Sequence, residues 1–359
     1  MAAICSTGAF ADPIYSVAPV LTPGFTGIQI YQINDSGQVV GFGNNPSGHN
    51  ETFLANTTTD PSAIPLPPTW LNLQGWGLND SGVVAASGPN ASVTILAATG
   101  TTSASTGLPL PSGGWSAALG LGISDTGYVT GYASKTGLTL PFLYNPNTGI
   151  SQTIALPSTG GWTQERGVGV NDSGQVTGWV YNGIDYQPFI GTPGAGTTVI
   201  PLPTGWISAQ GASVNDSGQV AGDGDTASGG YMAFIGTASG SMAIPLPTGA
   251  TSAETSTDTT GILNNAGDVV GFSNAGGWIW DAADGTLLLN PLLVTSGWNI
   301  TDAISISNNG LILALGTYEG GSSQWVELTP QTGTPEPATL LLSGAGLAAV
   351  ILRRRLSRA

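Results

Sequence analysis

Six aromatic side chains recur at one position of an internal repeat and could form a binding surface. Each stands twelve residues before a glycine that closes a recurring turn; they are Phe25, Trp70, Trp115, Trp162, Trp206 and Trp298. An indole ring can stack on the apolar face of a sugar, so the series predicts a ring of glycan-stacking platforms. The alternative is that the rings pack between sheets, where large flat side chains are commonly buried.

Carboxylates outside the repeat suggest a second chemistry, glycoside cleavage by a pair of acids. They are Glu51, Glu165, Asp185, Glu254, Asp258, Asp302 and Glu319. Nothing in their spacing selects two of them, and solvated loop acids are the simpler interpretation. We therefore assign no catalytic residue and expect no enzyme. A glycosidase-like carbohydrate-active enzyme is kept as the alternative.

Counts of single residue types exclude other chemistries. His49 is the only histidine and lies in the polar loop "NNPSGHNETF", so a Ser-His-Asp triad has no good candidate. Cys5 is the only cysteine, so metal sites built on histidine and cysteine are excluded. Arg166 is the only arginine before residue 334, which excludes enzymes that gather several arginines around a carboxylate. We expect no metal and no cofactor.

The charge of the chain is distributed unevenly. Four of the six basic residues lie in the last seven positions, which leaves twenty acids against Lys135 and Arg166 before residue 334. That part of the chain therefore has a net charge near −18. Such a surface repels phosphate backbones, so nucleic acid is not expected as a partner.

A repeat of about 45 residues organises the chain. The phrase "INDSGQVVG" at Ile33 returns in nearly the same form along the sequence. Its turn glycines are Gly37, Gly82, Gly127, Gly174, Gly218, Gly267 and Gly310, with spacings of 45, 45, 47, 44, 49 and 43. A period of this length is typical of a four-stranded propeller blade.

Each copy of this motif predicts a tight hairpin. Asn or Ser stands three residues before the glycine, which favours a type I turn followed by a left-handed residue. Aspartate follows the Asn or Ser in five copies, and Asn265 and Asn308 replace it in the last two. A turn role explains all seven, whereas calcium ligation would require alternating acids within one loop. Four residues after the glycine every copy has Gly or Ala, which we attribute to crowding near a common axis.

The ends of the repeat region predict how the fold closes. A fourth strand reading "AIPLP" or similar ends the earlier copies, and its prolines suit an outer edge strand. The seventh copy lacks this strand, and "YSVAPVLTPGF" from Tyr15 resembles the missing piece. We predict an all-β fold, a seven-bladed β-propeller over residues 12–333, in which the N-terminal strand completes the last blade.

Both termini are typical of an exported protein. Residues 1–11 end in Ala9-Phe10-Ala11, a small-x-small pattern of signal peptides, although no basic segment precedes it. Residues 338–352 carry no charge and predict a single transmembrane helix, which at about 1.5 Å per residue is short for a hydrocarbon core of about 30 Å. The basic cluster that follows would stay cytoplasmic and leave the body outside.

The last segment, residues 334–359, resembles a PEP-CTERM sorting signal. The resemblance rests on Pro335, Glu336 and Pro337, then an apolar stretch, then Arg353, Arg354 and Arg355. It implies an exported protein of a Gram-negative bacterium that makes exopolysaccharide, processed by an exosortase-type enzyme. The chain would be anchored in the inner membrane until processed and would then reach the cell surface or the extracellular matrix.

The repeat itself resembles the HAF family of extracellular repeats. Residues 33–41 match the first half of that pattern closely, and Ala233-Phe234 match its second half, although no copy has His-Ala-Phe intact. The resemblance implies an exported repeat protein with no established activity. We therefore predict a non-enzymatic, structural or adhesive protein of the cell surface or exopolysaccharide matrix, in which the six aromatics would bind glycan.

Overall fold

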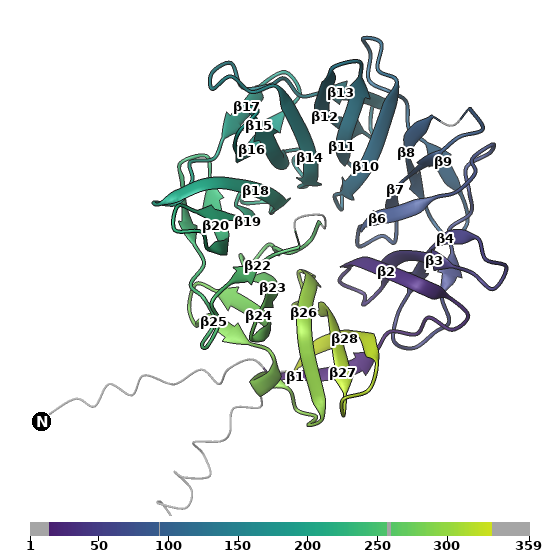
Figure 1. Cartoon of the computed structure of the whole chain (residues 1–359). Coiled ribbons are helices and arrows are strands. Elements are labelled where there is room, and N and C mark those ends of the chain that lie inside the picture. Colours follow the sequence, from purple (N-terminus) through teal and green to yellow (C-terminus); the bar gives the residue numbers. More distant parts are fainter. Residues whose placement is uncertain (1–13, 93, 257–259, 332–359) are drawn as a thin grey trace, which may run out of the picture.

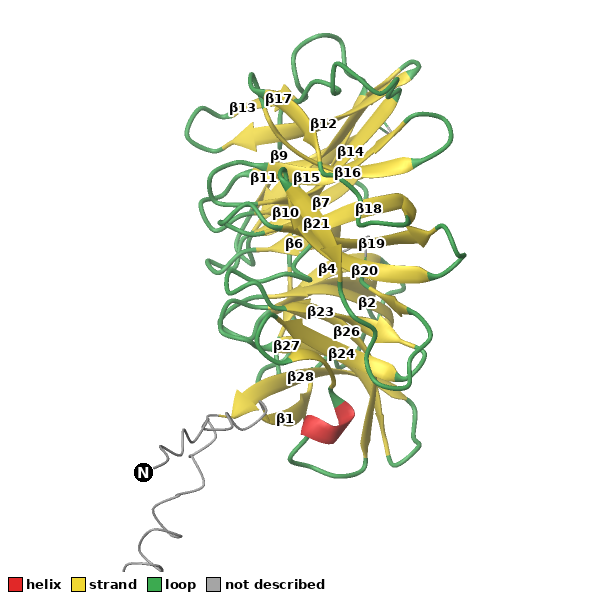
Figure 2. Cartoon of the chain, turned by 90° about the vertical axis from the view of Figure 1, so that its left-hand side faces the viewer, coloured by secondary structure: helices red, strands yellow, loops and turns green. Residues whose placement is uncertain are grey.

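The computed structural model describes residues 14–92, 94–256 and 260–331, and this part of the chain is all-β apart from one short 3-10 helix. Four-stranded groups, which we call blades, are arranged around a centre (Figure 1), and the body seen from the side is a disc with loops on both faces (Figure 2). The all-β propeller prediction is confirmed for the described residues.

Strands of the first five blades follow one another as antiparallel meanders. Blade 1 contains β2 (Thr26–Ile33), β3 (Val39–Asn44), β4 (Asn50–Ala55) and β5 (Ser62–Ala63). Blade 2 contains β6 (Gln74–Leu78), β7 (Val84–Pro89), β8 (Ile95–Gly100) and β9 (Ser105–Gly107). Blade 3 contains β10 (Ala117–Ile123), β11 (Val129–Lys135), β12 (Leu138–Asn145) and β13 (Ile150–Thr153). Blade 4 contains β14 (Gln164–Val170), β15 (Val176–Tyr181), β16 (Tyr186–Thr192) and β17 (Gly196–Val199). Blade 5 contains β18 (Trp206–Val214), β19 (Val220–Thr226), β20 (Tyr231–Thr237) and β21 (Gly240–Ala243).

The last two blades are joined into one eight-stranded sheet. Blade 6 contains β22 (Ala253–Glu254), β23 (Val269–Ser273), β24 (Gly276–Asp281) and β25 (Gly285–Leu288), and the 3-10 helix η1 (Asn290–Leu292) follows it. Blade 7 contains β26 (Trp298–Ile306), β27 (Ile312–Tyr318), β28 (Ser323–Gln331) and β1 (Ile14–Pro19). Between the described strands of the two blades, Phe272 pairs with Asp302. Phe272 also pairs with Glu254 of the two-residue inner strand β22.

The N-terminal strand lies beside the last strand of the chain. β1 pairs antiparallel with β28, with Ile14 opposite Gln331 and Val17 opposite Leu328. Tyr15 is 3% exposed, and its carbonyl accepts the N–H of Val294 at 2.9 Å. Residues from both ends of the described chain thus share one core cluster, in which Tyr15 and Leu328 are members.

The core lies between blades and is built from the repeat. The apolar residue two positions after each turn glycine is fully buried; these residues are Val39, Val84, Val129, Val176, Val220, Val269 and Ile312. Third-strand aromatics are fully buried as well; these are Phe53, Phe142, Phe189, Phe234 and Trp278. The period of 45 residues therefore places one aromatic layer and one aliphatic layer in most blades.

The small residue four positions after the turn glycine is required within its own sheet. A Cβ on Gly178 would lie 1.9 Å from the carbonyl oxygen of Arg166, where the paired inner strand has a bulge. The equivalent distance at Gly131 is 1.8 Å, from the carbonyl oxygen of Leu119. The contact with the bulged inner strand, and not crowding near the axis, is therefore the main reason for the small residue.

Two other expectations need correction or lie outside the described residues. The outer strands end before the "PLP" motif, and the residue that precedes the proline is instead buried between blades, as at Ile64, Ile200 and Ile244.

The predicted signal peptide at residues 1–11, the sorting signal at 334–359 and the helix at 338–352 all lie outside the described residues. Among the described residues no helix is long and apolar enough to cross a membrane.

Candidate functional site

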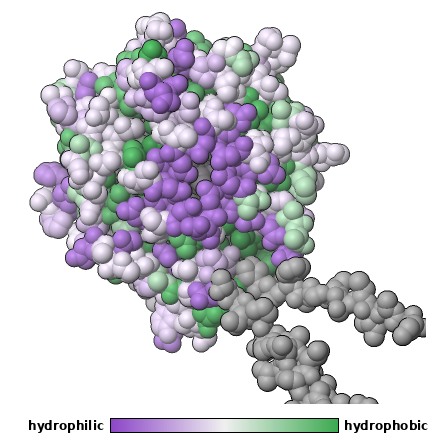
Figure 3. Space-filling view, turned by 180° about the vertical axis from the view of Figure 1, so that it is seen from behind, coloured by the Kyte–Doolittle hydropathy of each residue, from purple (hydrophilic) through white to green (hydrophobic). Residues whose placement is uncertain are grey.

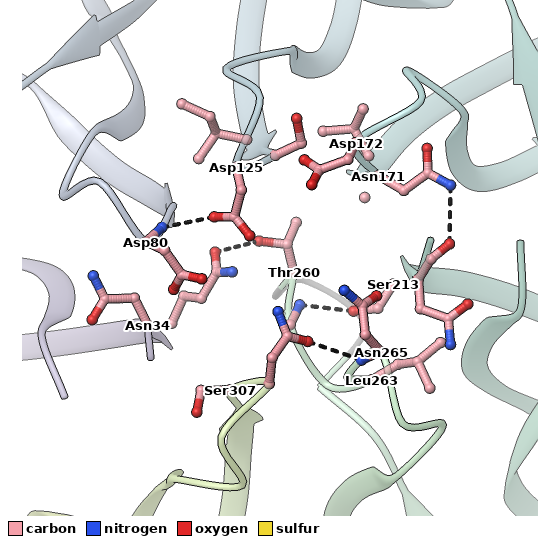
Figure 4. A pocket seen from close by; sticks show the side chains of 18 of the residues that line it. Asn34, Asp80, Asp125, Asn171, Asp172, Ser213, Thr260, Leu263, Asn265 and Ser307 are labelled. Atoms are coloured by element: carbon pink, nitrogen blue, oxygen red, sulfur yellow. Dashed lines mark hydrogen bonds between the residues drawn. The ribbon is translucent and has the colours of Figure 1, made fainter. Parts of the chain in front are cut away.

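The seven repeated turns meet around the centre of one face of the disc. Their geometry is the predicted one: the N–H of Gly37 donates to the carbonyl of Asn34 at 3.0 Å, and Gly37 has φ of 74°. The view from behind shows hydrophilic residues gathered at the centre of this face (Figure 3), and Figure 4 shows the side chains that line it. We call this set of turns the turn ring.

A closed circle of hydrogen bonds joins the turn ring. In each turn a backbone N–H donates to the side-chain oxygen of the Asp or Asn in the next turn, at 2.8–3.0 Å. The acceptors are Asp80, Asp125, Asp172, Asp216, Asn265, Asn308 and Asp35. The seventh link runs from Asn309 back to Asp35. The repeat predicts that these side chains serve their own turns, whereas they bond the neighbouring turn. The replacement of Asp by Asn in the last two copies fits this role, because both side chains supply an acceptor oxygen.

A second layer of links uses the turn asparagines. Each of the five asparagines holds its own turn through Oδ1 or Nδ2 and donates Nδ2 to the carbonyl of the next turn at 2.9–3.4 Å. Ser124 and Ser307 lack the second donor. In those two turns the backbone donor of the first circle moves one residue on, to Thr126 and Asn309. The sequence signal for this layer was the preference for Asn over Ser.

The turn ring surrounds a pocket of about 100 Å³ whose floor comes from blade 6. Residues 260–262 belong to the longest spacing of the repeat, from Gly218 to Gly267, and lie at the centre. There Thr260 donates to Gln32 at 2.9 Å and Ser213 accepts the N–H of Gly261 at 2.7 Å (Figure 4). The segment therefore links blades 1, 5 and 6. The lining is almost entirely Asn, Asp, Ser, Thr and short aliphatic residues, with no aromatic side chain.

Carboxylates of the turn ring influence each other's protonation. Desolvation, the largest cause, and the nearby Asp125 and Asp35 raise the pKa of Asp80 to about 6, although the N–H of Asp35 opposes the shift. The pKa of Asp125 is raised as well, first by desolvation. The circle of hydrogen bonds thus places carboxylates near one another. The free-energy cost of this arrangement increases with pH, because the carboxyl groups become ionised.

The six aromatics of the predicted series line the start of the inner strands, and each belongs to a core cluster that its own blade shares with the preceding blade. Trp115 is 8% exposed; Phe25, Trp70, Trp162, Trp206 and Trp298 are half-buried. The ring centroids of Phe25 and Phe53 are 4.7 Å apart, and those of Trp206 and Phe234 are 6.1 Å apart. The series therefore packs where neighbouring blades meet, and five of its rings keep a part of their surface open.

The candidate acids are scattered. Glu51 lies on β4 and accepts from Asn45, Asp302 lies on β26 and accepts from Thr301, and Asp258 lies outside the described residues. Glu165 is fully buried; its Oε1 accepts from Thr197 at 2.9 Å, and burial raises its pKa to about 8. His49 lies in an exposed turn.

One perturbed acid was missed by sequence reasoning. Asp223 on β19 is 1% exposed and accepts from the hydroxyl of Tyr231 and from the N–H and hydroxyl of Thr255, at 2.8–2.9 Å. Burial raises its pKa to about 7, and Glu254 contributes. Both oxygens are satisfied, so Asp223 ties β19 to the segment that leads to the pocket floor. Its position in the repeat carries Phe, Ser, Tyr, Trp or Leu elsewhere, which was the available signal.

Comparisons with known proteins agree with export and with the fold. The family model described as the PEP-CTERM protein-sorting motif matches residues 334–355. No curated protein matches the chain. The β-propeller domain of the Trilobed protease from Pyrococcus furiosus, described as having an open velcro topology, is 10% identical with a TM-score of 0.54, covering 89% of this chain and 96% of that one. YCF48 bound to D1 peptide is 11% identical with a TM-score of 0.50, covering 89% and 96%. Both similarities concern the fold alone.

Proposed function

We propose that this chain is a non-enzymatic, structural or adhesive protein of the cell surface or exopolysaccharide matrix. The observation that carries the proposal is the combination of a sorting motif at residues 334–355 with a propeller body whose central polar groups are used to link blades. A sorting motif of this kind indicates an exported protein and fits processing by an exosortase. Exopolysaccharide of a Gram-negative bacterium is the partner we propose, and the predicted helix at residues 338–352 would hold the chain in the inner membrane before processing.

The body that is exported is, in this proposal, a seven-bladed propeller closed by its N-terminal strand. Pairing of β1 with β28 and the circle of seven turn links support it. The HAF resemblance of the repeat is in keeping with an extracellular location. A closed disc whose blades are linked by hydrogen bonds is suited to a scaffold, because its edge and its faces keep their shape.

Glycan contact through the aromatic series is the adhesive part of the proposal. Five of the six rings are half-buried, so each offers one edge or face while its other side packs on the core. Sugars that stack there would span neighbouring blades on the same face. A glycosidase is not favoured, because the described candidate acids are scattered and the buried Asp223 has both of its oxygens in hydrogen bonds.

A glycan array on the full chain tests the proposal. We expect binding to one or more polysaccharides and at least a tenfold loss in Trp206→Leu and Trp298→Leu, which keep apolar volume in the core. Trp325→Leu is the matched control, because Trp325 is also half-buried but lies outside the series. Release of new reducing ends from a bound glycan would overturn the non-enzymatic assignment. Absence of binding to any glycan would leave a scaffold without the adhesive role.

A further inference from the structure

Arg166 is exposed and lies beside two aromatic rings. It is the only arginine among the described residues, and Lys135 is the only lysine. Lys135 lies over the ring of Trp115 at 4.5 Å and donates to the carbonyl of Gly113 at 3.3 Å. Arg166 is exposed on the inner strand β14, and its guanidinium carbon lies 4.6 Å from the ring centroid of Tyr132 and 5.1 Å from that of Trp179.

No carboxylate of the described residues forms an ion pair with this guanidinium within 4.0 Å. A protein with about ten times more acids than bases in its body could easily supply one. The five N–H donors of an arginine form a planar fork that fits the two oxygens of a carboxylate. Contacts with two aromatic rings hold the plane of the guanidinium without using those donors. The fork is therefore fixed in place and free to bind.

The surroundings of the fork are aromatic. The ring centroids of Trp179 and Tyr186 are 5.0 Å apart, and those of Tyr186 and Tyr181 are 4.6 Å apart in a stacked arrangement. Together with Tyr132 these four half-buried rings extend from β11 of blade 3 across β15 and β16 of blade 4. Strands hold all of them, so the cluster is a rigid surface. A ring-shaped ligand with one apolar face suits it better than an extended chain.

We propose that the cluster of Arg166, Tyr132, Trp179, Tyr186 and Tyr181 binds an acidic saccharide, with the carboxylate of a uronic acid on the guanidinium and the sugar ring on the aromatic side chains. The strong negative charge of the body disfavours densely charged anions such as polyphosphates. A single carboxylate on each sugar ring avoids most of that repulsion. This inference rests on the proposed function for the presence of polysaccharide at the cell surface, but it uses a site separate from the six-aromatic series.

Titration of the full chain with trigalacturonate and with its methyl ester tests the inference. The two probes have the same rings, and only the acid has carboxylates. We expect binding of the acid, at least tenfold weaker binding of the ester, and at least a tenfold loss for the acid in Arg166→Gln. Arg166→Lys should recover only part of this loss, because a lysine supplies charge without the planar fork. Lys135→Gln makes the same change in net charge and should bind the acid like wild type.

The outcomes separate this inference from the proposed function. Unchanged binding of the acid in a folded Arg166→Gln variant, checked by its thermal unfolding, would overturn the inference. Binding of neutral glycans that depends on Trp206 and Trp298, together with no binding of trigalacturonate, would overturn it and keep the proposed function. Equal binding of a glutamate tripeptide would overturn the assignment to a saccharide.

Discussion

The backbone N–H of Asn309 donates to the carboxylate of Asp35 at 2.9 Å, between residues 274 positions apart in sequence. This bond is the last link of the circle that joins the seven turns. Each link replaces a hydrogen bond to water and is worth little alone, about 0.5–1.5 kcal/mol. The circle as a whole fixes each blade relative to its two neighbours, and it gives the repeated aspartate a role that a single hairpin does not require.

Asp80 provides a test of the circle by two substitutions. Asp80→Asn keeps the acceptor oxygen, as Asn265 and Asn308 do, and removes a charge near Asp125 and Asp35. The folded-state pKa of about 6 lies above the value near 3.9 of an unfolded chain, so stability from Asp80 is present below pH 4 and is lost as pH rises through 6. We expect Asp80→Asn to unfold at a higher temperature than wild type at pH 8 and at nearly the same temperature at pH 4.

Asp80→Ala is the matched control. It removes the acceptor for the N–H of Asp35 and should lower the unfolding temperature at both pH values. Equal stability of the alanine and asparagine variants at pH 8 would contradict a hydrogen-bonding role for this side chain.

Tyr15→Ala tests the contribution of the N-terminal strand. Tyr15 is 3% exposed in the cluster that contains Leu292 and Leu328, so removal of its ring should cost about 3–5 kcal/mol. Urea unfolding gives this free energy, and limited proteolysis between β1 and β2, at residues 20–25, should release β1 faster. Tyr15→Phe keeps the ring and should retain most of the stability. A Tyr15→Ala variant as stable as wild type would mean that β1 does not complete blade 7.

Glu165 should make stability decrease with pH. Its folded-state pKa of about 8 lies above the value of 4.5 of the free side chain, so its contribution is fully present below pH 4.5 and is lost as pH rises through 8. Glu165→Gln is expected to equal wild type near pH 4.5 and to be more stable at pH 8, by at most about 1.4 kcal/mol per unit of pKa shift. Thr197→Val, which removes the hydroxyl that opposes the shift, should displace the transition to higher pH. A wild-type stability that is flat between pH 5 and 8 would refute this account.

Gly178→Ala should destabilise blade 4 by roughly 1–3 kcal/mol, because the added methyl group would meet the carbonyl of Arg166 on the bulged inner strand. Gly240→Ala in β21 is the control: no atom lies within 4 Å of its added Cβ, and its φ is not positive. That change should be neutral or slightly stabilising, since alanine restricts the unfolded chain. Similar unfolding free energies for the two variants would contradict the bulge explanation.

Local patterns of the sequence predicted the parts of the fold that depend on neighbouring residues. Asn34 and Gly37 indicated a type I turn with a left-handed residue, and Val39 indicated a buried strand position, because these preferences act over four to six residues. The period of 45 extended each of them to seven copies. The pairing of β1 with β28 was predictable as well, because the seventh copy lacks a strand that the residues before the first copy can supply.

The candidate sites depended on contacts between blades, which no local pattern encodes. The Asp35 carboxylate was predicted to serve its own turn, yet its oxygen meets Asn309 because the disc brings the first and seventh turns together. The surface around Arg166 combines a blade 3 tyrosine with a blade 4 tryptophan, both five positions after the turn glycine, where the other copies have Phe, Ser, Asp or Leu. By itself the sequence determined the repeated turns and strands, since hydrogen bonds and apolar spacing within one blade set them. Only the tertiary structure decided which side chains share a surface, since that depends on how neighbouring blades pack around the centre.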